Sequence, residues 1–169
     1  MAVRPLAVAL LVLVLALAAC GGHGSGSADR TTTHAAAAAA RWSHGLHAWG
    51  ARMNHAIDGI SVLFSQPADV RGIQAGNVRV GAILTRYEET LAACSIYVAR
   101  LGTAPATLAL AKREALHACV SLQHAADLIR SGVRQFQQGL GPDVLNNTSA
   151  PLSAGEDGVR RALLDTTPA

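Results

Sequence analysis

Residues 111–140 read AKREALHACVSLQHAADLIRSGVRQFQQGL. Apolar side chains recur here at alternating intervals of four and three residues, which is typical of one face of a long α-helix packed against other helices. This apolar stripe consists of Ala115, Cys119, Leu122, Ala126, Ile129, Val133, Phe136 and Leu140. Gly139 and the pair Gly141-Pro142 favour termination, so we expect the helix to end there.

The same spacing predicts an earlier long helix from about Thr33 to Ser65, which passes through the alanine run 35–40. We expect it to end just before Pro67, because proline cannot continue a helix but begins the next one well. Its apolar stripe consists of Trp42, Leu46, Trp49, Met53, Ala56, Ile60 and Leu63.

Between these two, a further long helix is predicted from about Val70 to Leu101. Its stripe consists of Val70, Ile73, Asn77, Val80, Leu84, Tyr87, Leu91, Cys94, Val98 and Leu101. Three glycines in its first half each cost about 1 kcal/mol relative to alanine, so this half is expected to be kinked, frayed or broken. Asn77 is polar on an apolar stripe. It either fixes the register of packing or marks a place where the helix is irregular.

A short fourth helix is expected after a linker over residues 141–152. Ser153-Ala154-Gly155-Glu156 matches a capping box, and Val159, Ala162 and Leu163 follow on one face. A helix of this length is not stable alone, so it must dock or remain mobile. The predicted fold class is therefore all-α, an antiparallel up-down-up bundle of three long helices with a short C-terminal fourth helix.

The N-terminal residues differ from the rest of the chain. Arg4 precedes the apolar run Leu6–Ala19, and this combination is typical of a secretory signal peptide. The run is shorter than the roughly 20 residues that span a bilayer. Leu17-Ala18-Ala19-Cys20 resembles the lipobox of bacterial lipoproteins. The resemblance implies cleavage before Cys20, acylation of that cysteine with chains such as palmitate, and a place on the extracytoplasmic face of the cell membrane.

The expected organisation follows from this motif. Residues 1–19 form the lipoprotein signal peptide, and residues 20–33 form the lipidated cysteine and a flexible tether rich in Gly, Ser and Thr. Residues 34–165 form the helical bundle domain, and residues 166–169 form a tail.

The two remaining cysteines are predicted to form a disulfide. With Cys20 acylated, Cys94 and Cys119 are left as an even pair in an oxidising compartment. In antiparallel helices their stripe positions face each other, and this register sets Leu91 opposite Leu122 and Leu101 level with Lys112. The alternative is two small buried thiols that do not meet.

Composition and motifs exclude several function classes. The formal net charge of +3 rests on 14 basic and 11 acidic residues, a balance that gives no concentrated basic patch for nucleic acid. The sequence has no Walker-type loop, dinucleotide-binding glycine fingerprint, paired Cys-x-x-Cys motif or Gly-x-Ser-x-Gly elbow.

The histidines are interpreted as surface residues, because they fall off the apolar stripes. The residues nearest to a metal-binding pattern are His44 and His47, and the Glu-x-x-His pair Glu114 and His117. Di-iron bundles use Glu-x-x-His twice with ligands pointing inward, whereas it occurs once here. A haem ligated by Met53 is the other metal alternative. Core packing is the better interpretation of that methionine.

Trp42 and Trp49 stand one heptad apart. We interpret them as core anchors whose ring N–H groups reach the edge of the bundle. The alternative is a candidate ligand groove of Trp42, Trp49, Met53 and Asn77. It would lie between the Thr33–Ser65 helix and the glycine-weakened half of the next one, where side-chain volume is missing.

These observations predict a lipid-anchored cell-envelope helical protein without enzymatic activity or cofactor, acting as an interaction or small-ligand-binding module. Its expected partners are the membrane, through Cys20, and an envelope protein or small hydrophobic ligand. The chain resembles small helical lipoproteins of GC-rich Gram-positive bacteria in its lipobox and its Cys94–Cys119 hairpin, a likeness that implies no particular activity. The alternatives are a metal- or haem-binding bundle of the envelope and a hydrolase acting on wall components.

Overall fold

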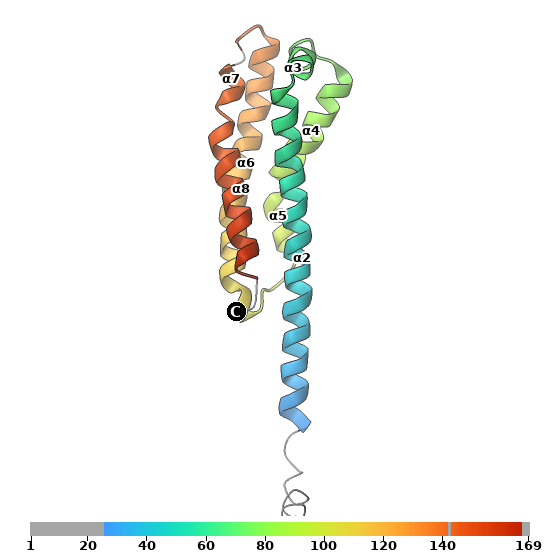
Figure 1. Ribbon diagram of the computed structural model, residues 1–169, viewed down its shortest axis with the longest axis vertical. Helices are drawn as coiled ribbons and strands as arrows, with labels where there is room; N and C mark the ends of the chain where they lie inside the picture. The colour runs from blue at the N-terminus through green and yellow to red at the C-terminus, as the bar shows by residue number, and fades with distance from the viewer. Residues whose placement is uncertain (1–25, 142, 167–169) are drawn as a thin grey trace, which may run out of the picture. The chain divides into compact units, whose positions relative to one another are not determined.

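The computed structural model describes residues 26–141 and 143–166 (Figure 1). Within these ranges every regular element is a helix and there is no strand, so the predicted all-α class is confirmed for this part of the chain. The chain divides into two units, residues 1–37 and 38–169. The packing described below is that of the second unit.

Helix α2 spans Gly26–Ser65 and is followed by Pro67, where termination was expected. It begins ahead of the predicted start at Thr33, so the tether expected over residues 20–33 is helical from residue 26 onward. The alanine run explains this difference, because alanine has the highest helix propensity and a helix extends at little cost once nucleated. Every residue of the predicted α2 stripe is buried.

The single helix predicted from Val70 to Leu101 is three helices: α3 (Pro67–Gln74), α4 (Val78–Ala92) and α5 (Cys94–Arg100). At the first break Gly76 adopts φ +67°, a left-handed conformation that glycine adopts without strain. Asn77 then caps α4, its Oδ1 accepting hydrogen bonds from the backbone N–H groups of Arg79 and Val80 at 3.0 and 3.3 Å. Asn77 therefore marks an irregularity, one of its two predicted roles.

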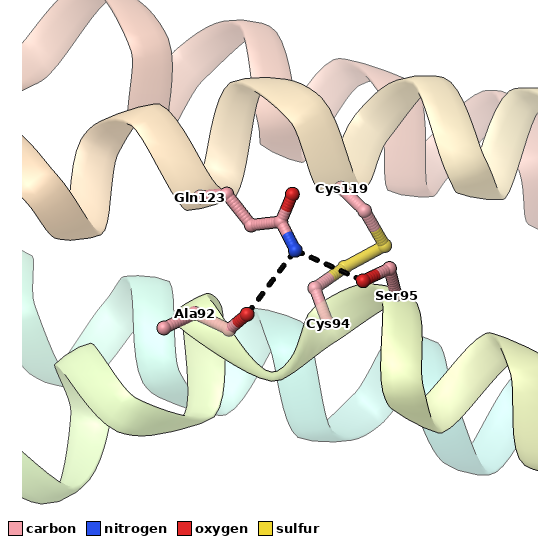
Figure 2. Close-up of a disulfide and its surroundings, with 5 residues drawn as sticks. All are labelled: Ala92, Cys94, Ser95, Cys119 and Gln123. Atoms are coloured by element: carbon pink, nitrogen blue, oxygen red, sulfur yellow. Dashed lines mark hydrogen bonds between the residues drawn. A yellow bond between two sulfur atoms is a disulfide. The ribbon is translucent and has the colours of Figure 1, made fainter.

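The second break, at Ala93, has no glycine or proline beside it. The N–H of Ile96 donates to the carbonyl of Ala93 at 3.0 Å instead of to that of Ala92. Gln123 on α6 donates its Nε2–H to the Ala92 carbonyl at 3.2 Å and to Ser95 Oγ at 2.9 Å (Figure 2). A side chain from a neighbouring helix thus satisfies the carbonyl that the break leaves free.

The hairpin that follows closes on a disulfide. A 3₁₀ turn, η1 (Ala106–Leu108), leads into α6 (Ala109–Gln137), and Cys94 of α5 is joined to Cys119 of α6 (Figure 2). Their Cα atoms are 5.3 Å apart and both residues are buried. Lys112 donates to the Gly102 carbonyl at 3.4 Å, a contact at the level expected from the cysteine pairing.

Helix α6 ends slightly before its predicted last stripe residue. Gly139 adopts φ +94°, and its N–H donates to the Phe136 carbonyl at 3.1 Å. Leu140 lies beyond this turn and is exposed. The other stripe residues of α6 are buried or partly buried.

The C-terminal helix is longer than the sequence indicated. A short helix α7 (Asp143–Asn146) and α8 (Ser149–Leu164) occupy most of the expected linker 141–152, so the start expected at the Ser153 capping box is wrong. Pro151 is the third residue of α8, where its missing N–H removes no intrahelical hydrogen bond.

Helix α8 docks closely on α6. Glycines allow this approach: a Cβ on Gly158 would lie 2.7 Å from the Ala118 Cβ, and one on Gly155 would overlap Leu122. Leu152, Val159 and Ala162 are buried with the residues of α2 and α6 in one core. Helix α6 contacts α4 and α5 as well as α8.

Candidate functional site

A pocket of about 330 Å³ lies between helices α3 and α4 and the C-terminal half of α6. Its floor is apolar and consists of Ile73, Leu84, Ile129 and Val133. Its polar lining consists of Asn77, Thr85, Glu88, Arg130, Arg134 and Gln137. This volume is at the lower end of the range of small-ligand pockets, about 300–1,000 Å³.

The break between α3 and α4 creates the pocket. The turn at Gly76 ends α3, and Asn77 starts α4 in a new direction. Gly81, on the first turns of α4, lines the pocket without a side chain, and a Cβ added there would meet nothing within 4 Å. The glycine-rich sequence of this half therefore leaves an unfilled volume where α4 passes α6.

Gln137, at the end of α6, links two walls of the pocket. Its Nε2–H donates to the Ile73 carbonyl at 3.1 Å, which also accepts a hydrogen bond from the N–H of Gly76 at the end of α3. The bond ties the end of α6 to α3 and fixes one wall of the pocket.

An ion pair crosses the pocket. The carboxylate of Glu88, a residue only 8% exposed, contacts the guanidinium of Arg130. Arg130 also pairs with Asp127 at 3.1 Å. A buried carboxylate requires such compensation, so the pair fixes the Arg130 side chain between α4 and α6.

The four residues of the candidate groove predicted from the sequence do not share this pocket. Trp42, Trp49 and Met53 are buried in the core, and Asn77 is exposed and lines the pocket between α4 and α6. The indole N–H groups of both tryptophans are buried without a hydrogen-bond partner among the described residues. The expectation that they reach the edge of the bundle is wrong, because both ring nitrogens lie within the buried core.

The candidate metal ligands are either exposed or in contact with a different partner each. His44 and His117 are exposed, and His47 Nε2 lies 3.1 Å from Thr166 Oγ1. Glu114 pairs with Arg161 of α8 at 3.2 Å. Within residues 26–141 and 143–166, no group of three or more His, Cys, Asp or Glu side chains is placed to share a metal ion.

Sequence reasoning missed the charged residues of the pocket. Arg130 and Arg134 are four residues apart beside the stripe residues Ile129 and Val133, so they share a helix face next to the core. Glu88 stands beside Glu89 in the sequence, and two adjacent residues do not share a helix face. The spacing of the two arginines was the available signal.

The predicted acylation site, Cys20, lies outside the described residues. Among the helices that the structure does describe, none has both the length and the apolar character needed to cross a bilayer. Comparison with protein-family models, with curated proteins and with solved structures finds no match to this chain.

Proposed function

We propose that this protein is a non-enzymatic, lipid-anchored helical protein of the cell envelope that binds a small, largely apolar molecule in the pocket between α3–α4 and α6. The observation that carries the binding proposal is the pocket itself. It combines buried aliphatic side chains from two sides, Ile73 and Leu84 facing Ile129, with a polar lining. Such a combination is typical of small-molecule sites.

The framework of this proposal is an antiparallel up-down-up bundle in which α2, the broken α3–α5 segment and α6 are the long members and α8 is the fourth. The Cys94–Cys119 pairing and the Gln123 and Gln137 hydrogen bonds between α6 and the broken segment support this arrangement. A bundle holds such a pocket open because its walls are fixed by core packing on the far side of each helix.

The anchor rests on the sequence Leu17-Ala18-Ala19-Cys20 and the apolar run before it. An acylated cysteine would hold the ligand-binding bundle at the outer surface of the membrane. Protein recovered from membranes should have an intact mass that begins at Cys20 and includes acyl groups. An unacylated chain that still contains residues 1–19 would refute the anchor.

Photolabelling tests the pocket in the full-length protein, in membranes of cells that produce it. The probes are ten-carbon alkyl diazirines with an alcohol, a carboxylate or a trimethylammonium head, and the labelled peptides are mapped by mass spectrometry. At least one probe should label the segments 73–88 and 129–137 in a saturable manner.

Gly81→Leu supplies the decisive variant. The position lines the pocket and has open space at its Cβ, so leucine should fill the volume while favouring the helix. Ala82→Leu, on the neighbouring exposed position outside the lining, is the matched control. We expect Gly81→Leu to abolish labelling of both segments and Ala82→Leu to leave it unchanged. Equal labelling of both variants would reject the pocket as a binding site.

A further inference from the structure

More positive than negative side chains line the pocket. They consist of one carboxylate, Glu88, and two guanidinium groups, Arg130 and Arg134. Glu88 is matched by Arg130, and Arg130 has a second carboxylate partner in Asp127. Arg134 has no carboxylate within 4 Å among the described residues, so it is the one lining charge without an ionic partner there.

Two neutral donors lie in the same lining. The Oδ1 of Asn77 is occupied by the α4 cap, and no described residue accepts a hydrogen bond from its Nδ2. Thr85, which carries a hydroxyl, lines the pocket about two turns farther along α4. Together with Arg134 they offer donors at the polar edge of an otherwise aliphatic cavity.

We propose that the ligand is a small amphipathic monoanion, a carboxylate with an aliphatic chain. The chain lies on Ile73, Leu84 and Ile129, and the carboxylate meets Arg134 at the polar edge. This inference rests on the proposed function, because it assigns the chemical class of the ligand to the same pocket.

Charge complementarity favours this class over neutral or cationic ones. A single carboxylate neutralises the one unpaired guanidinium, and Arg binds carboxylates through charge-assisted hydrogen bonds that are stronger than neutral ones. A cationic head would face Arg134 without compensation, since Glu88 is already paired with Arg130. Arg134 is exposed, so its guanidinium would stay solvated beside a neutral head and would add no ionic attraction to that ligand.

The three photoreactive probes distinguish these classes. We expect the carboxylate probe to reach half-maximal labelling at a concentration about tenfold or more below that of the alcohol, and the trimethylammonium probe to label least. Arg134→Gln should raise the half-maximal concentration of the carboxylate probe to that of the alcohol and leave the alcohol unchanged. Arg113→Gln, an exposed arginine on α6 outside the pocket, is the matched control and should change neither.

The outcomes separate the two proposals. If the alcohol labels the pocket as well as the carboxylate does, and Arg134→Gln changes neither, the anionic ligand class is overturned while pocket binding stands. If Arg113→Gln weakens labelling as much as Arg134→Gln does, the preference comes from general surface charge and the assignment of Arg134 fails. If no probe labels the two segments in the wild type, both proposals fail.

Discussion

At the scale of single residues, two glycines predict opposite effects of the same substitution. A Cβ on Gly59 of α2 would overlap the ring of Tyr87, which packs edge-on against His55 at 5.5 Å. Overpacking of this kind costs about 1–3 kcal/mol, against a helix-propensity gain of up to about 1 kcal/mol. Gly59→Ala should therefore lower the free energy of unfolding. Gly81→Ala, with open space at its Cβ, should raise it by about 0.5–1 kcal/mol.

Denaturant unfolding of the two variants, followed by helical circular dichroism, measures both effects against the wild type. Gains of equal size would mean that Tyr87 does not pack on Gly59 in solution. The sequence alone could not separate these two positions, because a helical glycine differs from alanine by propensity unless a neighbour occupies the missing volume. Gly72, Gly76 and Gly81 likewise looked equivalent, yet only Gly76 has a positive φ.

At the scale of helices, Gln123 should stabilise the junction between α4 and α5. Its amide donates to the Ala92 carbonyl and to Ser95 Oγ, and each net hydrogen bond is worth about 0.5–1.5 kcal/mol. Gln123→Ala should lower the free energy of unfolding by about 1–2 kcal/mol. It should also increase hydrogen exchange of the amides around Ala93, where the helix is already interrupted.

Gln135→Ala is the control for this prediction, since Gln135 is exposed on the same helix and its side chain makes no hydrogen bond among the described residues. Its effect should stay within about 0.5 kcal/mol. If Gln123→Ala has no larger effect, the break at Ala93 does not depend on Gln123.

The two breaks also mark what could be predicted at this scale. Gly76 and Asn77 indicated the first break, because glycine commonly follows the end of a helix and asparagine commonly caps the start of the next. The stretch Leu91-Ala92-Ala93-Cys94 contains no residue type that indicates the second break. At that break the Ala92 carbonyl accepts a hydrogen bond from Gln123 of α6, a tertiary contact that local propensity does not contain. The sequence signal for these contacts was the spacing of Gln123 and Gln137, which stand two heptads apart on α6. Gln123 bonds the Ala92 carbonyl and Gln137 bonds the Ile73 carbonyl.

At the scale of the whole molecule, the apolar stripes predicted the helical class and most of the core. Of the four residues predicted to line a groove, only Asn77 lines the candidate pocket. Its cause, missing volume at the glycines of α4, was identified, but the facing wall is α6 and the tryptophans are buried elsewhere. Stripe positions indicate that a residue is buried; they do not indicate which of several helices covers it. Helix α8, which covers part of α2, was too short in the sequence pattern to be assigned a place.

The disulfide is the contact whose removal should affect the whole unit. It links residues 25 apart in sequence, and closing a loop of this length stabilises the fold by about 3.5 kcal/mol in the chain-entropy model. Cys94→Ala combined with Cys119→Ala should lower the free energy of unfolding by about this amount. The denaturant m-value should rise, because the unlinked unfolded chain exposes more surface.

Intact mass before and after reduction checks the bond directly, and the two values should differ by two hydrogens. The m-value supplies a readout that lost packing would not move: both cysteines are buried, so truncation to alanine alone would destabilise the folded state without expanding the unfolded one. A lower stability with an unchanged m-value would therefore assign the effect to the core, and two free thiols in the native protein would contradict the pairing. A rise in m together with the loss of stability would place the main action of this bond on the unfolded chain.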